Sequence, residues 1–477
     1  MSDEFEAVVN RVAERIRPDE TEHDALIDAA ETLIQRVDAV VDTLPVDAEA
    51  VLAGSTTRET WIAGDRDIDL FVQFSPELPR DELREYGLKV GHAVLPDGRE
   101  EFAEHPYVVG EFEGFRVDLV PSYALDDATE IRSAVDRTPF HTEYVTERMT
   151  SELASDVRVC KQFFTGIGVY GSDLRTEGFS GFLTELLILE FDGFRPFLEA
   201  VSDWKPPVRI DPNDHGTATF DDPLVVIDPT DPERNVAAVL SAENLARLQH
   251  YARELLDSPR ESLFDPPERT PLEPEEIRTG FRERHTTPVA LRVTVPDMVD
   301  DQLWPQLRRS RDGIVRALER RGFYVFRSDA FATEHDRFPL EETEPEDRTV
   351  VLLFELAVAQ LPRVERHVGP PVHVRPHATS FYRTYADADV AGPFIDGDRY
   401  VVERERPVTS AVTLLESDAL FEAALGTGIK RALEDGYDVL VGDELGGLAD
   451  LFGEAFAWYL DPKTRGTDSG QQNHAPR

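Results

Sequence analysis

The segment from Gly54 to Asp69, GSTTRETWIAGDRDID, constrains what this chain can fold into more than any other stretch. Asp67 and Asp69 lie two positions apart beside an apolar run, and side chains two apart on a β-strand point to the same face. A third carboxylate, Asp118, lies in the run VDLV, which is typical of a buried strand. We therefore expect two neighbouring strands that bring three carboxylates to one face of a sheet, close to a Gly-Ser turn.

Three carboxylates on rigid strands are hard oxygen ligands, the kind that one or two Mg²⁺ ions prefer. Mg²⁺ held there would activate an attacking hydroxyl and hold a leaving pyrophosphate, so the pattern predicts nucleotidyl transfer. The backbone amides of Gly54 and Ser55 suit a phosphate group, and Arg58 can offer a forked donor to the same triphosphate. The competing interpretation of the Gly-Ser pair is an ordinary turn with a helix cap.

Acidic residues are so frequent in this chain that an acidic-x-acidic pattern is weak by itself. The sequence has 94 of them in 477 residues, so the pattern recurs by chance. The alternative is that Asp67 and Asp69 are solvated surface acids. The Gly-Ser turn, the apolar flanks and the later lone Asp118 together favour a functional site.

The charge balance indicates an unusual solvent. The formal net charge is −44, and only five of the 50 basic residues are lysine. This composition is typical of proteins adapted to multi-molar salt, where a Debye length of ~3 Å or less screens the repulsion. Cys160 is the single cysteine, which excludes a disulfide framework and a cysteine zinc site. Apolar runs of the ~18 residues that a membrane span needs are missing and the N-terminus has no basic start, so we expect a cytoplasmic, halophilic protein without membrane contact.

The hydrophobic pattern predicts an α+β protein of several domains, since 477 residues are too many for one core. Around the Gly-Ser turn the expected order is helix, strand, turn, strand, helix and two paired strands, which suits a small mixed sheet with helices on one side. These elements are expected at 24–44, 49–53, 67–72, 80–95 and 106–121. Farther along, we expect helices at 142–165, 180–203, 241–257, 301–321 and 418–435, strands at 290–295, 349–358 and 400–405, and a proline-rich linker from Ser258.

Four segments together resemble the archaeal-type (class I) CCA-adding tRNA nucleotidyltransferases. They are GSTTRETWIAGDRDIDLF from Gly54, VDLVPSY from Val117, SAVDRTPFHTEYV at 133–145 and RVCKQFFTGIGVYGSDLRTEGFSGFLTELL at 158–187. The last two are the most diagnostic, because many polymerase-beta-like enzymes share the carboxylate triad. That family usually has Glu-x-Asp where this chain has Asp67-x-Asp69, a change that keeps the ligand type.

The resemblance implies a function: template-independent addition and repair of the 3′-terminal CCA of tRNA from CTP and ATP, with Mg²⁺ and release of pyrophosphate. Asp67, Asp69 and Asp118 would be the catalytic metal ligands, and the protein would be a homodimer. The implied architecture is a polymerase-beta-like nucleotidyltransferase head, a helical neck, and an α/β body and tail. The expected ranges are 1–145 for the head, 146–262 for the neck, 263–310 and 390–465 for the body, 311–389 for the tail, and 466–477 for a disordered end.

The same resemblance implies nucleotide contacts by His141, Lys161, Tyr170 and Arg234. Lys161 is one of few lysines in an arginine-rich chain, as expected of a phosphate contact that needs a compact charge, and the alternative is a surface lysine. For Tyr170 and His141 the alternatives are a core tyrosine and a structural histidine. The planar fork of Arg234 could serve both C and A, whose Watson–Crick edges offer an amine beside a ring-nitrogen acceptor.

Two basic islands interrupt the acidic background, at 302–327 with seven arginines and two acids and at 360–385 with four arginines and one acid. Basic helices are usually solvated faces, but in so acidic a chain we expect these to touch phosphate. The resemblance places both islands where tail and body would meet the acceptor and T arms of tRNA. The candidate contacts are Arg308, Arg309, Arg311, Arg363, Arg366 and Arg375.

Two other classes of function compete with this interpretation. The first is a related nucleotidyltransferase of another substrate class, a poly(A)-type polymerase or a small-molecule enzyme. Addition that stops after CCA distinguishes a CCA-adding enzyme from a polymerase that adds an open-ended run of A. The second is an RNA-binding protein on an inactive head, which the intact triad and the retained Lys161 argue against.

Overall fold

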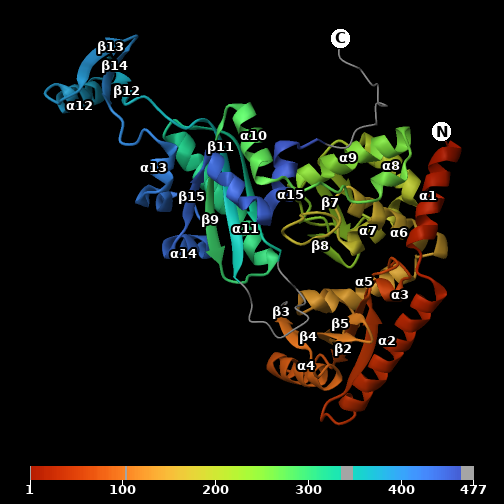
Figure 1. The fold of residues 1–477 in the computed structure, drawn as a ribbon. Coiled ribbons are helices and arrows are strands. Elements are labelled where there is room, and N and C mark those ends of the chain that lie inside the picture. The colour runs from red at the N-terminus through yellow and green to blue at the C-terminus, as the bar shows by residue number, and fades with distance from the viewer. Residues whose placement is uncertain (1, 103–104, 335–346, 464–477) are drawn as a thin grey trace. The chain divides into compact units, whose positions relative to one another are not determined.

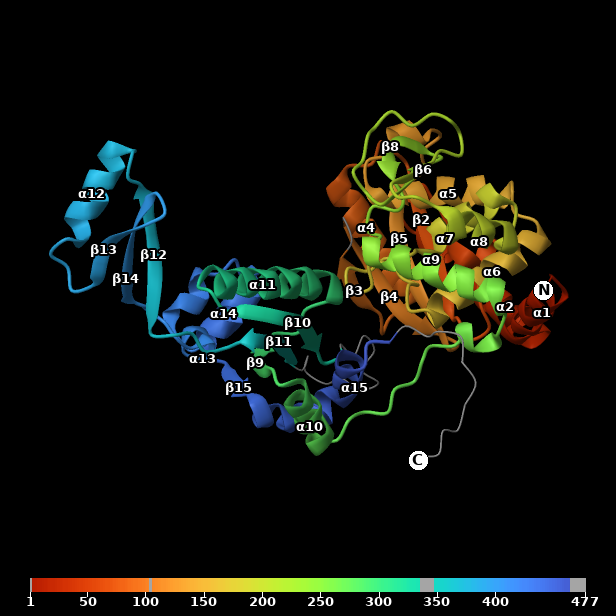
Figure 2. The same cartoon turned by 90° about the horizontal axis from the view of Figure 1, so that it is seen from above.

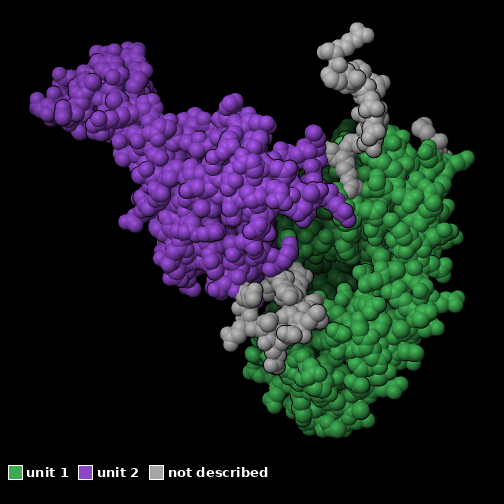
Figure 3. All heavy atoms as spheres, viewed as in Figure 1, with its two compact units in different colours: residues 1–267, 465–477 green, residues 268–464 purple. Residues whose placement is uncertain are grey.

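The computed structural model describes residues 2–102, 105–334 and 347–463, and the chain divides into two compact units, residues 1–267 and 268–464 (Figure 3). The end expected to be disordered, 466–477, lies outside the described residues.

The first unit begins with α1 (Ser2–Ile16) and then forms a five-stranded mixed sheet in the order β1-β2-β5-β4-β3. Strands β2 and β5 are parallel and their other neighbours are antiparallel. Helices α2 and α4 pack on one face of the sheet (Figure 1). The bounds are α2 Glu20–Val41, β1 Ala48–Ala53, α3 Gly54–Thr57, β2 Asp67–Phe74, α4 Arg80–Val94, β3 Arg99–Phe102, β4 Pro106–Phe112 and β5 Phe115–Tyr123. The expected helix-strand-turn-strand-helix order is confirmed, with α3 in the turn and β3 as a further edge strand.

Alternation along β2 decides which side chains face the helices. Ile68 and Leu70 are buried in the core that α2 and α4 cover, whereas Asp67 and Asp69 lie on the opposite face. The two carboxylates therefore share one face of the sheet, as their spacing predicts.

The rest of the first unit is mainly helical and has its own aromatic-rich core. The helix expected at 142–165 is two helices, because Thr150 caps the start of the second by accepting from Leu153 N. The helix expected at 180–203 is also divided, at Asp192 and Gly193, which both have positive φ. The elements are α5 Arg137–Thr146, α6 Ser151–Gly166, α7 Gly181–Phe191, α8 Phe194–Asp203, α9 Ala242–Asp257 and a small sheet of β6 Val208–Ile210, β7 Leu224–Asp228 and β8 Asp231–Asn235.

The second unit contains a four-stranded sheet in the order β10-β11-β9-β15, with helices on both faces. Its central strand β11 is apolar along most of its length because both faces are covered. Alternate residues pack under α11, α13 and α14 on one side and under α10 and α15 on the other. The bounds are α10 Pro274–Arg284, β9 Thr287–Val295, α11 Asp300–Arg320, β10 Tyr324–Ala332, β11 Arg348–Val358, α13 Ala411–Leu415, α14 Thr427–Asp435, β15 Asp438–Val441 and α15 Ala449–Leu460.

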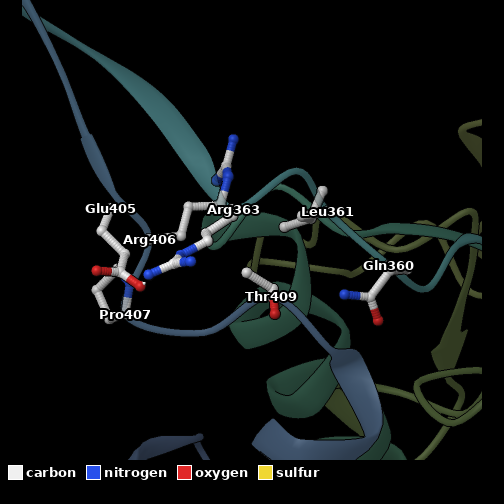
Figure 4. A pocket seen from close by; sticks show the side chains of 7 residues that line it. All are labelled: Gln360, Leu361, Arg363, Glu405, Arg406, Pro407 and Thr409. Atoms are coloured by element: carbon white, nitrogen blue, oxygen red, sulfur yellow. Dashed lines mark hydrogen bonds and ion pairs between the residues drawn. The ribbon is translucent and has the colours of Figure 1, made fainter. Parts of the chain in front are cut away.

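A separate three-stranded sheet, β12-β14-β13, carries one helix, α12, and is seen together with it in Figure 2. The bounds are β12 Val364–Pro371, α12 Arg375–Tyr385, β13 Ala391–Asp396 and β14 Arg399–Glu405. Two hydrogen-bonded segments connect this sheet to the four-stranded one, with Leu361 N donating to Thr409 O and Arg406 N to Arg363 O. Beside them lies a pocket of about 360 Å³ lined by Gln360, Leu361, Arg363, Glu405, Arg406, Pro407 and Thr409 (Figure 4).

The elements do not divide at the two boundaries expected inside this unit. The boundary between 310 and 311 falls inside α11, which is one helix. The boundary between 389 and 390 separates β12 from β13 and β14, although all three form one sheet. Tertiary pairing decides both points, since β10 and β11 pair with β9 rather than with the small sheet. Among the described residues, no helix is both long enough and apolar enough to cross a membrane.

Candidate active site

The three predicted carboxylates lie on the two parallel strands β2 and β5. Asp69 is opposite Asp118 in the strand register, and Asp67, two residues earlier and opposite Arg116, lies on the same face. Asp67 is exposed, whereas Asp69 and Asp118 are half-buried. The structure therefore brings together side chains from two distant parts of the chain, as the two apolar runs predict.

The electrostatics of this cluster are those of crowded negative charge. Burial, with the neighbouring charges of Asp118 and Asp67, raises the pKa of Asp69 to about 6. Burial also raises the pKa of Asp118, although Arg116 Nε donates to its Oδ1 at 2.9 Å and opposes that effect. A cation at this position would relieve the repulsion between the carboxylates.

The donor set fits a divalent ion in its chemistry, since it offers hard oxygens on two rigid strands. Within residues 2–102, 105–334 and 347–463, no three acidic, histidine or cysteine side chains already converge on a metal geometry. Both carboxylate oxygens of Asp118 instead accept from Arg116, at 2.9 and 3.3 Å.

The Gly-Ser turn lies directly against Asp69. Gly54 has a φ of +75°, and a Cβ built on it would lie 1.9 Å from Asp69 Oδ2. Only glycine can pass so close to the carboxylate in this conformation. Ser55, the next residue, is half-buried within α3. The turn and the carboxylates therefore form one site.

Arg58 points from the end of α3 to the helices that follow the sheet. Its Nε donates to Glu185 Oε1 at 3.0 Å, and its Nη1 donates to Thr142 Oγ1 at 3.1 Å. Glu185 is fully buried and also accepts from Thr60 Oγ1 at 2.6 Å. We did not predict Glu185 from the sequence, although an acid between the apolar residues of the helix GFLTELLILEF, the first of its two glutamates, is a signal that could have identified it.

Lys161 is not a surface lysine, because only 2% of it is exposed. Its Nζ donates to the backbone oxygen of Thr60 at 2.8 Å, and burial lowers its pKa. Tyr170 is half-buried, and burial raises its pKa. A Cβ on Gly181 would lie 3.4 Å from Tyr170 Oη and 3.8 Å from Lys161 Nζ, so both polar ends meet at this glycine.

His141 and Arg234 come together through a residue that we did not predict, Asp228. Oδ2 of Asp228 accepts from His141 Nε2 at 2.9 Å and from Arg234 Nη1 at 2.6 Å. Although burial raises the pKa of Asp228, hydrogen bonds from His141 and Thr230 outweigh it and hold that pKa well below its usual range. An acid at the end of the apolar run LVVID is the only local signal for this residue.

The six candidate tRNA contacts lie on two groups of elements in the second unit. On α11, Arg309 Nε donates to the backbone oxygen of Leu425 and Arg311 pairs with Asp312, while Arg308 is half-buried. On and beside the three-stranded sheet, Arg363 pairs with Glu405, Arg366 pairs with Asp396, and Arg375 is exposed at the start of α12.

The mixed sheet with its carboxylates on two parallel strands defines a polymerase-beta-like nucleotidyltransferase, and residues 34–141 match the family described as "Nucleotidyltransferase domain". Residues 155–265 match "tRNA nucleotidyltransferase, second domain", and residues 284–442 match "CCA-adding enzyme, C-terminal domain". The chain is 61% identical to the CCA-adding enzyme of Haloarcula marismortui over 97% of its own length and 100% of that protein. It is 55% identical to the CCA-adding enzyme of Halorubrum lacusprofundi over 96% of its own length and 99% of that protein. The chain therefore belongs to the family of CCA-adding enzymes.

A solved structure of the Cid1 poly(U) polymerase, bound to Mg 3′-dATP, is also similar. It covers 56% of this chain and 100% of that one, at 16% identity and a TM-score of 0.44. A likeness this distant says nothing about the substrate of the present chain.

Proposed function

We propose that this protein adds and repairs the 3′-terminal CCA of tRNA from CTP and ATP without a nucleic-acid template. The observation that carries the proposal is the match to CCA-adding enzymes along 97% of the chain. The intact cluster of Gly54, Asp67, Asp69 and Asp118 supports an active head rather than an inactive one. A poly(A)-type polymerase is not favoured, because the C-terminal half matches the CCA-adding family as well.

Nucleotidyltransferases generally use divalent metal ions, and we propose Mg²⁺ for this one. Asp67, Asp69 and Asp118 would hold it, and the bound ion would supply positive charge to the triphosphate and the leaving pyrophosphate. We propose that Asp118 also helps to activate the attacking 3′-hydroxyl.

The remaining predicted contacts suit a nucleotide held beside the carboxylates. Arg58 and Ser55 belong to the turn that touches Asp69 and would bind the triphosphate, together with Lys161 and Tyr170. We propose that His141 and Arg234 hold the base. A head at about 1–145 and a neck at about 146–262 would then enclose the nucleotide from two sides.

The tRNA contacts of this protein are the subject of a further proposal, and its oligomeric state stays a prediction. We propose that the arginines of α11 and of the three-stranded sheet contact the acceptor and T arms, since these basic positions stand out in a chain of net charge −44. Homodimer formation and a cytoplasmic location, both expected of this family, stay predictions.

Replacing Arg308, Arg309 and Arg311 together by Ala tests the first of these contacts. We expect weaker tRNA binding with an unchanged KM for CTP, because none of the three is among the residues proposed to bind the nucleotide. Arg195→Ala, which removes a half-buried arginine paired with Glu6 and Glu199, is the control for the loss of one positive charge outside α11. Unchanged tRNA affinity in the triple variant would exclude α11 as a tRNA contact.

Sequencing of reaction products tests the function directly. Purified protein in molar KCl and Mg²⁺ is given CTP, ATP and tRNA transcripts that lack CCA, end in C or end in CC. We expect each product to end in CCA and to grow no further. Tails of repeated A, or transfer that survives Asp69→Asn, would contradict the proposal.

A further inference from the structure

We propose that Asp228 is a positioning residue that selects the incoming base by holding His141 and Arg234 in one arrangement. This inference rests on the proposed function, because it takes these two side chains as the ones that contact the base. Asp228 is the last residue of β7, and it would touch neither nucleotide nor metal itself.

The carboxylate of Asp228 is fully buried and each oxygen accepts two hydrogen bonds. Oδ2 accepts from His141 and Arg234, as described above. Oδ1 accepts from the backbone N of Thr230 at 2.9 Å and from Thr230 Oγ1 at 2.8 Å. Four donors around one buried carboxylate leave it a single orientation, and charge-assisted bonds of this kind are about twice as strong as neutral ones.

The arrangement determines which parts of His141 remain available. Its Nε2 faces the carboxylate and therefore carries a proton, which leaves Nδ1 as the ring's other polar atom. The ring also stacks on Phe182, with centroids 3.9 Å apart and planes 16° apart. Between Asp228 and Phe182, the imidazole has little freedom to turn.

In the described part of the chain, Arg234 has one hydrogen-bond partner, Asp228. Asp228 binds its Nη1, while 37% of its side chain remains exposed. The other guanidinium donors stay directed by the same bond and can meet the acceptor groups of a base edge. C and A have an acceptor at the Watson–Crick ring nitrogen, whereas U and G carry an N–H there that would oppose a donor. Loss of the Asp228 bond would therefore weaken the distinction between CTP and UTP.

The competing explanation is that Asp228 only stabilises the β7–β8 hairpin. Asp231, at the start of β8, offers a control because it also pairs with α5, through Arg137 Nη2 at 3.1 Å, whereas the described hydrogen bonds of His141 and Arg234 to this hairpin go to Asp228. Asp228→Asn and Asp231→Asn each remove one carboxylate charge from the same hairpin. Only the first one changes the groups proposed to hold the base.

The experiment measures kcat and KM for CTP, ATP and UTP on a tRNA transcript that lacks CCA, in molar KCl. For Asp228→Asn we expect KM for CTP and ATP to rise about tenfold or more and the UTP-to-CTP ratio of kcat/KM to rise by a similar factor, with a smaller change in kcat. Asp231→Asn should keep the wild-type ratio. In the double variant Asp228→Asn with Arg234→Ala, the UTP-to-CTP ratio should be close to that of Arg234→Ala alone. The reason is that Asp228 is proposed to affect this ratio through Arg234.

Thr230→Val keeps the charge of Asp228 and removes one of its four donors, so it tests the proposal even if Asp228→Asn does not fold. It should raise the UTP-to-CTP ratio about two- to threefold. An unchanged ratio in Thr230→Val would overturn the positioning role, and so would a wild-type ratio in folded Asp228→Asn or equal changes in Asp231→Asn. Failure of the proposed function would differ from either result, since the wild-type protein itself would then not make CCA ends.

Discussion

At the scale of single residues, the surroundings of Asp69 change the pKa of its carboxyl group. Burial and the charges of Asp118 and Asp67 raise its pKa to about 6, above the ordinary value of 3.8. The folded protein therefore holds this proton more tightly than the unfolded chain does. The resulting stability is present below about pH 4 and is lost as pH rises through about 6.

Asp69→Asn should consequently stabilise the metal-free protein at neutral pH while it abolishes nucleotide transfer. Because the variant lacks the ionised carboxylate, we expect its free energy of unfolding to be higher by roughly 2 kcal/mol at pH 7.5, and this difference should shrink as the pH falls toward 5. Urea unfolding in molar KCl with EDTA measures it at both pH values. Added Mg²⁺ should stabilise the wild type more than the variant. A variant that is less stable than the wild type at pH 7.5 would show that burial and the neighbouring carboxylates do not destabilise the ionised form of Asp69.

Gly54 supports the same site through its backbone. Gly54→Ala combines a φ of +75° with a Cβ only 1.9 Å from Asp69 Oδ2, so the turn must move away from the carboxylate. We expect a loss of about 1–3 kcal/mol in the free energy of unfolding and at least a hundredfold loss of transfer. Gly64→Ala is the matched control, since Gly64 has a φ of +90° and no atom within 4 Å of an added Cβ. Equal activity in the two variants would show that the contact at Gly54 is unimportant.

At the scale of elements, the buried pair of Arg58 and Glu185 joins α3 to α7. Their side chains are 8% and 0% exposed, so water screens the pair little. Helix α3 carries the Gly-Ser turn, and α7 belongs to the helical part of the first unit. The pair therefore links the two halves of the proposed nucleotide site.

Glu185→Gln should therefore destabilise the first unit and weaken nucleotide binding. Removing one charge leaves Arg58 buried without a counter-charge, which we expect to lower the free energy of unfolding by about 3 kcal/mol. Glu243→Gln removes the exposed i,i+4 pair with Arg247 and should change stability by less than about 0.5 kcal/mol. Thermal unfolding and the KM for ATP measure both effects, and equal stability of the two variants would contradict the role given to Glu185.

At the scale of the whole molecule, the net charge of −44 makes salt a condition of stability. Dilution from molar KCl to ~0.1 M lengthens the Debye length from ~3 Å to ~10 Å, so the acidic surface repels itself over longer distances. We expect the unfolding temperature to fall steeply over this range. Circular dichroism at a series of KCl concentrations measures it, and a temperature that does not depend on salt would contradict the adaptation inferred from composition.

Much of the fold could be predicted because the patterns that encode it are local. The alternation of Ile68 and Leu70 with Asp67 and Asp69 is a property of adjacent residues, and so is the apolar stripe of α2. The breaks after α5 and α7 were missed because a capping threonine and a left-handed Asp192 interrupt an otherwise continuous helical pattern. The pairing of β12 with β14 and β13 across the expected boundary between 389 and 390 could not be predicted, since strand pairing is decided between distant segments.

The sequence by itself determined the kind of site: three carboxylates on paired strands, a glycine turn beside them, and a family that carries these motifs in this order. Only the tertiary structure decided which neighbours hold those groups. It buries Lys161 under the backbone of Thr60, sets Glu185 against Arg58, and places Asp228 between His141 and Arg234. The physical reason is that strand and helix periodicity depends on adjacent residues, whereas a buried charge finds its partner only when distant segments pack together.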